Sequence, residues 1–165
     1  MYVEQLLLIL CGLVLRSNGE NPPPKPDVQV SILKVERDER GSVVFHIRVS
    51  NLSSKPVYLH EDSRQVRVPY AVNIEMWTER QGWQFLGPYR DIPCRKVFGL
   101  LPGESVEKDV VIIDPYPLLP GSKNISVSGD HRATVNYFRS KRAAKKKDKG
   151  FWAVSEKVYV APKRR

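Results

Sequence analysis

Apolar and polar residues alternate most regularly between residues 42 and 59, and this stretch predicts how the chain is organised. Four apolar residues recur at every second position: Val43, Phe45, Ile47 and Val49. A period of two places them on one face of a β-strand and their polar neighbours on the other. The segment 51–56, Asn-Leu-Ser-Ser-Lys-Pro, predicts a turn, because its polar side chains bond to nearby backbone and its proline lacks a ladder donor. A second alternation, Val57 and Leu59, follows at once.

Similar short apolar patterns, separated by turn residues, continue along the chain. We expect strands over residues 28–35, 42–50, 57–59, 72–78, 83–86 and 106–113, a strand within 127–139, and a last strand over 151–160. In the first of them the apolar positions change parity after Ile32, which indicates a β-bulge or a crossing between sheets. No segment shows a convincing period of 3.6. The sequence therefore predicts an all-β fold, an Ig-like antiparallel β-sandwich of seven to nine strands.

A chain of 165 residues is long enough to bury a core without disulfides or metals. The inward-facing set is expected to consist of Val43, Phe45, Ile47, Val49, Val72, Ile74, Met76, Val110, Ile112, Val135 and Tyr137. Trp77 and Trp83 are expected to fill the core as its largest side chains.

The first 27 residues do not follow the strand pattern. A ten-residue apolar run, residues 6–15, is too short to span a bilayer and is typical of a signal peptide, with Ser17 and Gly19 as small residues before the cleavage point. The alternative is a short hydrophobic element packed on the domain. We expect a signal peptide over 1–19, a proline-rich spacer over 20–27, the sandwich over 28–160 and a basic tail over 161–165.

Export also bears on the cysteines and the glycosylation sequons. Cleavage would leave Cys94 as a single thiol, either buried or paired between chains. Asn51 and Asn124 match the N-glycosylation sequon, but both also suit turns. The predicted location is extracytoplasmic, either periplasmic or secreted.

The net charge of +9 is concentrated near the C-terminus, where residues 131–165 hold twelve Lys or Arg and two Asp or Glu. The densest run joins the last two expected strands, which we expect to pair as a hairpin. Its cationic residues are Arg139, Lys141, Arg142, Lys145, Lys146, Lys147 and Lys149. A run of like charges repels itself and is expected to stay mobile. Arg132 and the tail residues 163–165 are candidates to extend it.

This loop has two interpretations. It either binds a polyanion, with affinity from counterion release, or is a solvated hairpin tip whose charges serve solubility. Four aromatic residues flank it, and they either stack on a ligand or belong to the core: Tyr137, Phe138, Phe151 and Trp152. In an exported protein, nucleic acid is a poor candidate, and an acidic protein, an anionic polysaccharide or lipid headgroups are better ones.

The sequence does not favour an enzyme. His46, His60 and His131 lie in separate strands or loops, and the chain has no His-x-x-x-His motif or glycine-rich phosphate loop. We expect no catalytic residues, no metal and no cofactor.

A resemblance rests on four features: the segment 51–59, the tryptophan-bearing strand through Trp77, the Leu-Leu-Pro-Gly-Glu-Ser turn at 100–105, and the terminal tyrosine-containing strand near Tyr137. Together they resemble secreted bacterial Ig-like sandwiches, such as the cell-adhesion-related bacterial domain and the Ig-like intracellular proteinase-inhibitor family. The resemblance implies the fold and an extracytoplasmic location but no site residues. It leaves two alternatives to polyanion binding: a sheet edge that binds a protein or blocks a protease, and a purely structural accessory domain.

Overall fold

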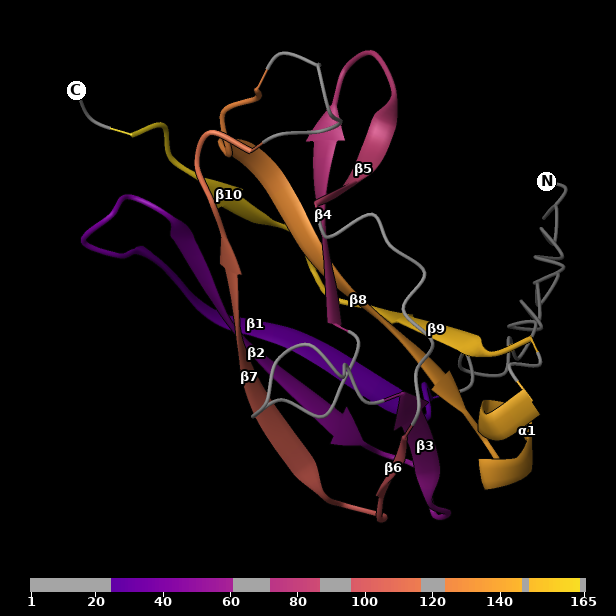
Figure 1. The fold of residues 1–165 in the computed structure, drawn as a ribbon. Helices are drawn as coiled ribbons and strands as arrows, with labels where there is room; N and C mark the ends of the chain where they lie inside the picture. The colour runs from indigo at the N-terminus through magenta and orange to yellow at the C-terminus, as the bar shows by residue number, and fades with distance from the viewer. Residues whose placement is uncertain (1–24, 61–71, 87–95, 117–123, 147–148, 164–165) are drawn as a thin grey trace, which may run out of the picture.

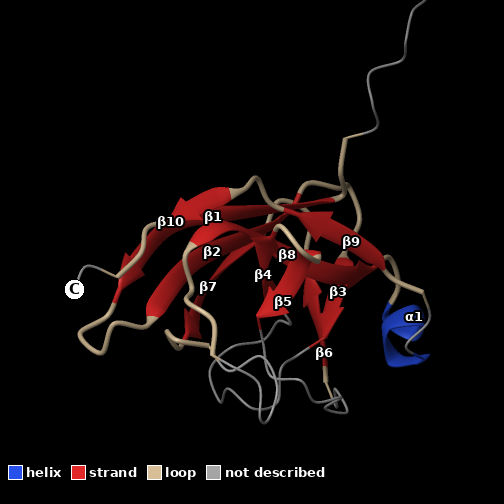
Figure 2. Ribbon diagram, turned by 90° about the horizontal axis from the view of Figure 1, so that it is seen from above, coloured by secondary structure: helices blue, strands red, loops and turns tan. Residues whose placement is uncertain are grey.

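The computed structural model describes residues 25–60, 72–86, 96–116, 124–146 and 149–163 (Figure 1). The smaller antiparallel sheet has the order β1-β2-β7, made of β1 (Val28–Arg37), β2 (Val43–Asn51) and β7 (Ser105–Ile112). The larger sheet contains β3 (Val57–His60), β4 (Val72–Thr78), β5 (Gly82–Leu86), β6 (Val97–Leu100), β8 (Gly129–Phe138), β9 (Phe151–Val154) and β10 (Val158–Val160). The short helix α1 (Lys141–Lys146) lies at one end (Figure 2). The predicted all-β sandwich is confirmed.

Strand β8 is the hub of the larger sheet. Along one edge it pairs with β4 and then, from Tyr137 onward, with β3. Along the opposite edge it pairs with β10 and β9. Its odd-numbered residues from His131 to Tyr137 face the core, so its even-numbered residues lie on the outer face of this sheet.

The core lies between the two sheets and follows the predicted alternation. Of the expected residues, Val110 is only partly buried and the others belong to the buried cluster. Both tryptophan predictions are wrong. Trp77 is 48% exposed, and its cross-strand partner Trp83 lies beside it on the outer face. The reason is parity, because Trp77 follows the inward-facing Met76 and must point the other way.

The parity change in the first strand is a β-bulge. The pairing of β1 with β2 shifts register between Ile32 and Lys34. The extra residue, Leu33, is 45% exposed. This shift lets Val35 rejoin the inward set opposite Phe45.

The turn at residues 51–56 carries the chain from the smaller sheet to the larger one. Asn51 is fully buried, and its side-chain Nδ2 donates to the carbonyl oxygens of Lys55 and Leu100, both at 2.9 Å. Its Oδ1 accepts from the Ser53 amide at 2.9 Å. Asn51 is thus a structural turn residue, as one interpretation of the sequon proposed. Asn124, the second sequon asparagine, is exposed.

Two expectations for the C-terminal part need correction. The predicted strand 151–160 is divided into β9 and β10. Between them, the Ala133 amide donates to the Ser155 hydroxyl at 2.9 Å and not to a backbone carbonyl of a neighbouring strand. With this division and with β6, which was not predicted, the described residues form ten strands. The basic hairpin connection, expected to be a mobile loop, contains helix α1. In the described part of the chain, no helix is long and apolar enough to cross a membrane.

Candidate polyanion-binding surface

Helix α1 begins at a well-formed cap. The Ser140 hydroxyl accepts the Ala143 amide hydrogen at 3.1 Å, and the Ser140 carbonyl accepts that of Ala144 at 3.1 Å. Serine is a favoured N-cap and alanine the best helix former. These short-range signals support a helical turn within the cationic run.

The helix is held on the outer face of the larger sheet. Ala144 is 1% exposed, and its carbonyl oxygen accepts a hydrogen bond from Nε2 of His60 at 2.8 Å. The His60 ring lies 4.8 Å from that of Phe138, which is itself buried. Because Phe138 is an outward-facing residue of β8, its burial shows that α1 covers this end of the sheet.

The cationic side chains of α1 point away from the sheet. The helix contains Lys141, Arg142, Lys145 and Lys146, all exposed. At 100° per residue they fill an arc of about 140° opposite the two alanines. Lys149, beyond the helix, is also exposed. Among the described residues, no carboxylate forms an ion pair with any of these five cations.

Arg139 differs from the other members of the predicted set. Its Nε donates to Oδ2 of Asp27 at 2.6 Å, and its guanidinium lies 4.3 Å from the centre of the Phe151 ring. The hydrogen bond with Asp27 raises the pKa of Arg139. Arg139 therefore joins the start of β1 to the β8–β9 hairpin. Lys147, the remaining member, lies outside the described residues.

The expected extensions of this surface are not supported. Arg132 lies nine residues before α1, about 30 Å away along an extended strand, and pairs with Glu75 at 2.6 Å. In the tail, the Lys163 side chain lies against Gly41 in the β1–β2 turn, far from α1 (Figure 1). Residues 164–165 are outside the described part.

The flanking aromatic residues divide into two kinds. Tyr137 is buried in the core, as the core interpretation predicted, whereas Phe138 is buried on the outer face beneath α1. Phe151 is partly exposed but stacks on Tyr137, with ring centres 5.6 Å apart. Trp152 is 60% exposed and has no ring contact with another described residue. Trp152 is thus available to a ligand.

His60 donates a hydrogen bond to α1, and the other two histidines, His46 and His131, lie in different environments. His46 lies on the outer face of the smaller sheet, where Nδ1 is 2.7 Å from Asp109 and Nε2 is 3.0 Å from Glu36. His131 is buried in the core, and its burial lowers its pKa. In the described part of the chain, no three His, Cys, Asp or Glu residues gather in a way that would hold a metal ion.

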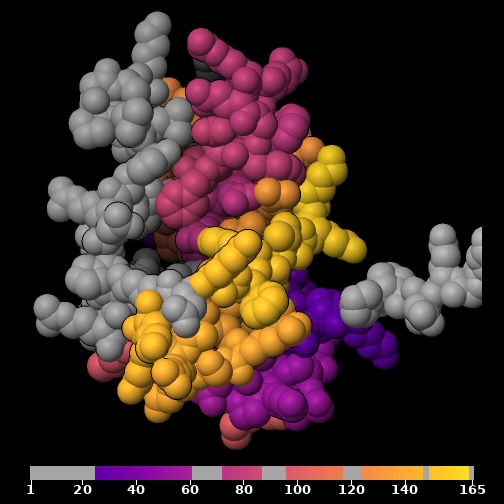
Figure 3. All heavy atoms as spheres, turned by 90° about the vertical axis from the view of Figure 1, so that its right-hand side faces the viewer, coloured from indigo at the N-terminus to yellow at the C-terminus, as the bar shows by residue number. Residues whose placement is uncertain are grey.

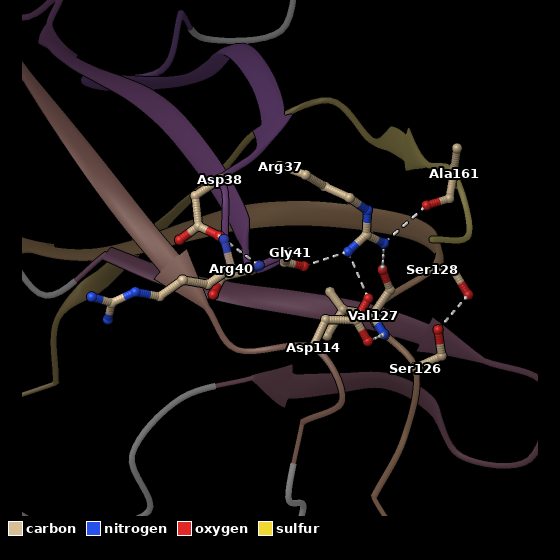
Figure 4. Close-up of polar contacts among 10 residues, drawn as sticks. Arg37, Asp38, Arg40, Gly41, Asp114, Ser126, Val127, Ser128 and Ala161 are labelled. Atoms are coloured by element: carbon tan, nitrogen blue, oxygen red, sulfur yellow. Dashed lines mark hydrogen bonds and ion pairs between the residues drawn. The ribbon is translucent and has the colours of Figure 1, made fainter. Parts of the chain in front are cut away.

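A second polar cluster, which the sequence analysis missed, lies where the β1–β2 turn meets the chain after β10, and Figure 4 shows its contacts. Arg37 donates to Oδ2 of Asp114 at 2.6 Å and to the carbonyl oxygens of Gly41 and Ala161 at 2.8 and 3.1 Å. Asp114 Oδ1 also accepts the Val127 amide hydrogen at 3.0 Å. These hydrogen bonds link four segments of the chain.

No family model matches the chain, and a search of curated proteins finds no significant similarity.

Proposed function

We propose that the protein is a non-catalytic, exported binding module that contacts an acidic partner or an envelope polyanion through α1 and Lys149. The observation that carries this proposal is a short helix, docked through Ala144, that presents four exposed cations on one side. Cations held on a fixed element lose less side-chain and backbone freedom on binding than cations on a mobile loop. Release of counterions from the polyanion supplies the affinity.

Export is supported by the apolar run at residues 6–15 and the small residues after it. The Ig-like resemblance supports the same location. In that compartment, anionic polysaccharides and lipid headgroups are the abundant polyanions. The proposal therefore includes a mature chain that begins at Glu20.

A salt series tests the binding surface. Affinity for heparin, anionic lipid vesicles and duplex DNA is measured at increasing salt for the wild type and for Lys145→Ser/Lys146→Ser. For DNA, removing two contacting cations should reduce the slope of log K against log salt by roughly 2.

The matched control is Arg40→Ser/Arg80→Ser, which removes two exposed cations from turns remote from α1. This variant should bind nearly like the wild type. Equal losses in both double variants would show a response to net charge alone and would rule out α1 as the contact surface.

A further inference from the structure

The outer faces of the two sheets differ in their chemistry. On the smaller sheet the polar side chains pair with one another: Lys34 with Glu36, Glu36 and Asp109 with His46, Arg48 with Glu107, and Ser50 with Ser105. The outer face of the larger sheet instead carries all three tryptophans of the chain, Trp77, Trp83 and Trp152. Large aromatic side chains gathered on an exposed face indicate a contact surface.

Register aligns these side chains along β8. Residues directly opposite each other in a sheet share a face. On one side of β8, Trp152 lies opposite Asn136, and Tyr159 lies opposite Asp130. Trp152 is 60% exposed and Tyr159 68%.

On the other side of β8, Glu75 lies opposite Arg132. The Arg132 guanidinium covers the Trp83 ring at 4.3 Å, and Trp77 meets Trp83 edge-on at 5.5 Å between ring centres. We name the surface formed by Trp77, Trp83, Trp152 and Tyr159 the aromatic face.

Helix α1 stands at one end of the aromatic face. Phe138 is the next outward residue of β8 after Asn136, and α1 covers it. From Phe138 to Asp130, eight residues at about 3.3 Å each span about 26 Å of strand. Figure 3 shows the β4–β5 hairpin in magenta, the C-terminal strands in yellow and the segment containing α1 in orange on the same side of the molecule.

We propose that the aromatic face and α1 together bind an anionic polysaccharide. This inference rests on the proposed function and specifies its ligand. The C–H faces of sugar rings would stack on Trp152, Tyr159 and Trp77, while the uronate or sulfate groups pair with the cations of α1. Polar side chains lie between the aromatic ones and offer hydrogen bonds to sugar hydroxyls: Asn73, Arg132 and Asn136.

Two properties favour a sugar polymer over a bilayer. The exposed aromatic residues are spread along an extended sheet face and do not gather at one protruding tip. They also alternate with polar groups, which a hydrocarbon layer would leave without hydrogen-bond partners. The cations at one end complement the charge of an acidic chain.

The experiment compares three polymers with the full chain. Polygalacturonate has sugar rings and charge, polyphosphate has charge alone, and dextran has sugar rings alone. We expect polygalacturonate to bind most tightly and to shift the tryptophan fluorescence, since all three tryptophans lie on this face. Trp152→Ala and Tyr159→Ala should each weaken polygalacturonate binding about tenfold, the loss of roughly 1.4 kcal/mol of contact, and leave polyphosphate binding within about twofold of wild type.

The matched control is Val111→Ala, which truncates an exposed apolar side chain on the opposite sheet and should change neither affinity. Equal unfolding midpoints show that the variants are folded. This inference would be overturned if both aromatic variants bound polygalacturonate with the affinity of the wild type. It would also be overturned if the protein bound anionic vesicles in a way that depends on Trp152 and did not bind polygalacturonate. If Lys145→Ser/Lys146→Ser bound both charged polymers with the affinity of the wild type, the proposed function would be overturned instead.

Discussion

At the scale of single residues, His131 shows how a polar group is accommodated in this core. Its Nδ1 lies 2.9 Å from the Gly129 carbonyl oxygen and therefore carries the proton that this bond requires. Its Nε2 is buried without a partner among the described residues, and its ring lies 5.4 Å from that of Phe45. The neutral ring fits this site, whereas a charged ring would leave a buried N–H donor unpaired.

This environment predicts loss of stability in mild acid. Burial lowers the pKa of His131 below its ordinary 6.5, although the bond to the Gly129 carbonyl opposes the shift. Below pH 6.5 the unfolded chain binds a proton that the folded chain does not bind until lower pH. The free energy of unfolding should therefore fall as pH decreases through this window, by up to about 1.4 kcal/mol per pH unit from this group.

Urea unfolding of the wild type and His131→Gln at pH 7.5 and 5.5 measures this contribution. The glutamine variant lacks the titrating ring and should lose less stability between the two pH values. An identical loss in both proteins would assign the acid sensitivity to other groups.

At the scale of elements, α1 packs on the sheet through one small buried side chain, that of Ala144, and through the hydrogen bond from His60. Ala144 is 1% exposed where the helix packs on the sheet, so a larger side chain at this position would have to displace its neighbours. Its neighbour Ala143 is only partly buried. The two alanines therefore form a matched pair for testing whether docking matters.

We expect Ala144→Leu to lift α1 from the sheet, since overpacking a filled site costs about 1–3 kcal/mol. Hydrogen–deuterium exchange of residues 138–146 should become faster, while exchange in β2 should not change. Ala143→Leu is the control and should retain slow exchange. Protection retained in Ala144→Leu would mean that the helix adapts without leaving the sheet.

At the scale of the whole molecule, Arg37 and Asp114 link distant parts of the chain. The pair connects the β1–β2 turn, the segments after β7 and before β8, and the chain after β10 (Figure 4). The Asp114 side chain is 5% exposed, and that of Arg37 is 23% exposed. Removing one partner leaves the other poorly solvated.

Asp114→Ala should therefore lower the free energy of unfolding by about 3–5 kcal/mol, because it leaves the Arg37 charge without its ion-pair partner and the Val127 amide without its acceptor. Glu107→Ala removes an exposed ion pair with Arg48 and should cost at most about 1 kcal/mol. Chemical denaturation of both variants measures the difference. Similar small losses would show that the pair contributes no more than a surface ion pair.

The sequence by itself determined the all-β class, the inward-facing aliphatic residues and the change of parity near Ile32, which the strand pairing shows to be a bulge. These follow from a period of two, which depends only on local backbone geometry. The same rule, applied to its neighbours, places Trp77 outside; assigning it to the core by size alone was the error. The sequence also located the cationic run but not its shape, although Ser140 and the two alanines carry a weak helical signal.

Tertiary structure decided which outer surfaces are covered and which are free. Docking of α1 includes the hydrogen bond from His60, which lies 84 residues from Ala144 in the sequence. The Arg37–Asp114 pair spans 77 residues, and the aromatic face combines side chains from four strands around β8. Such contacts depend on the register and order of distant strands, which no local pattern encodes.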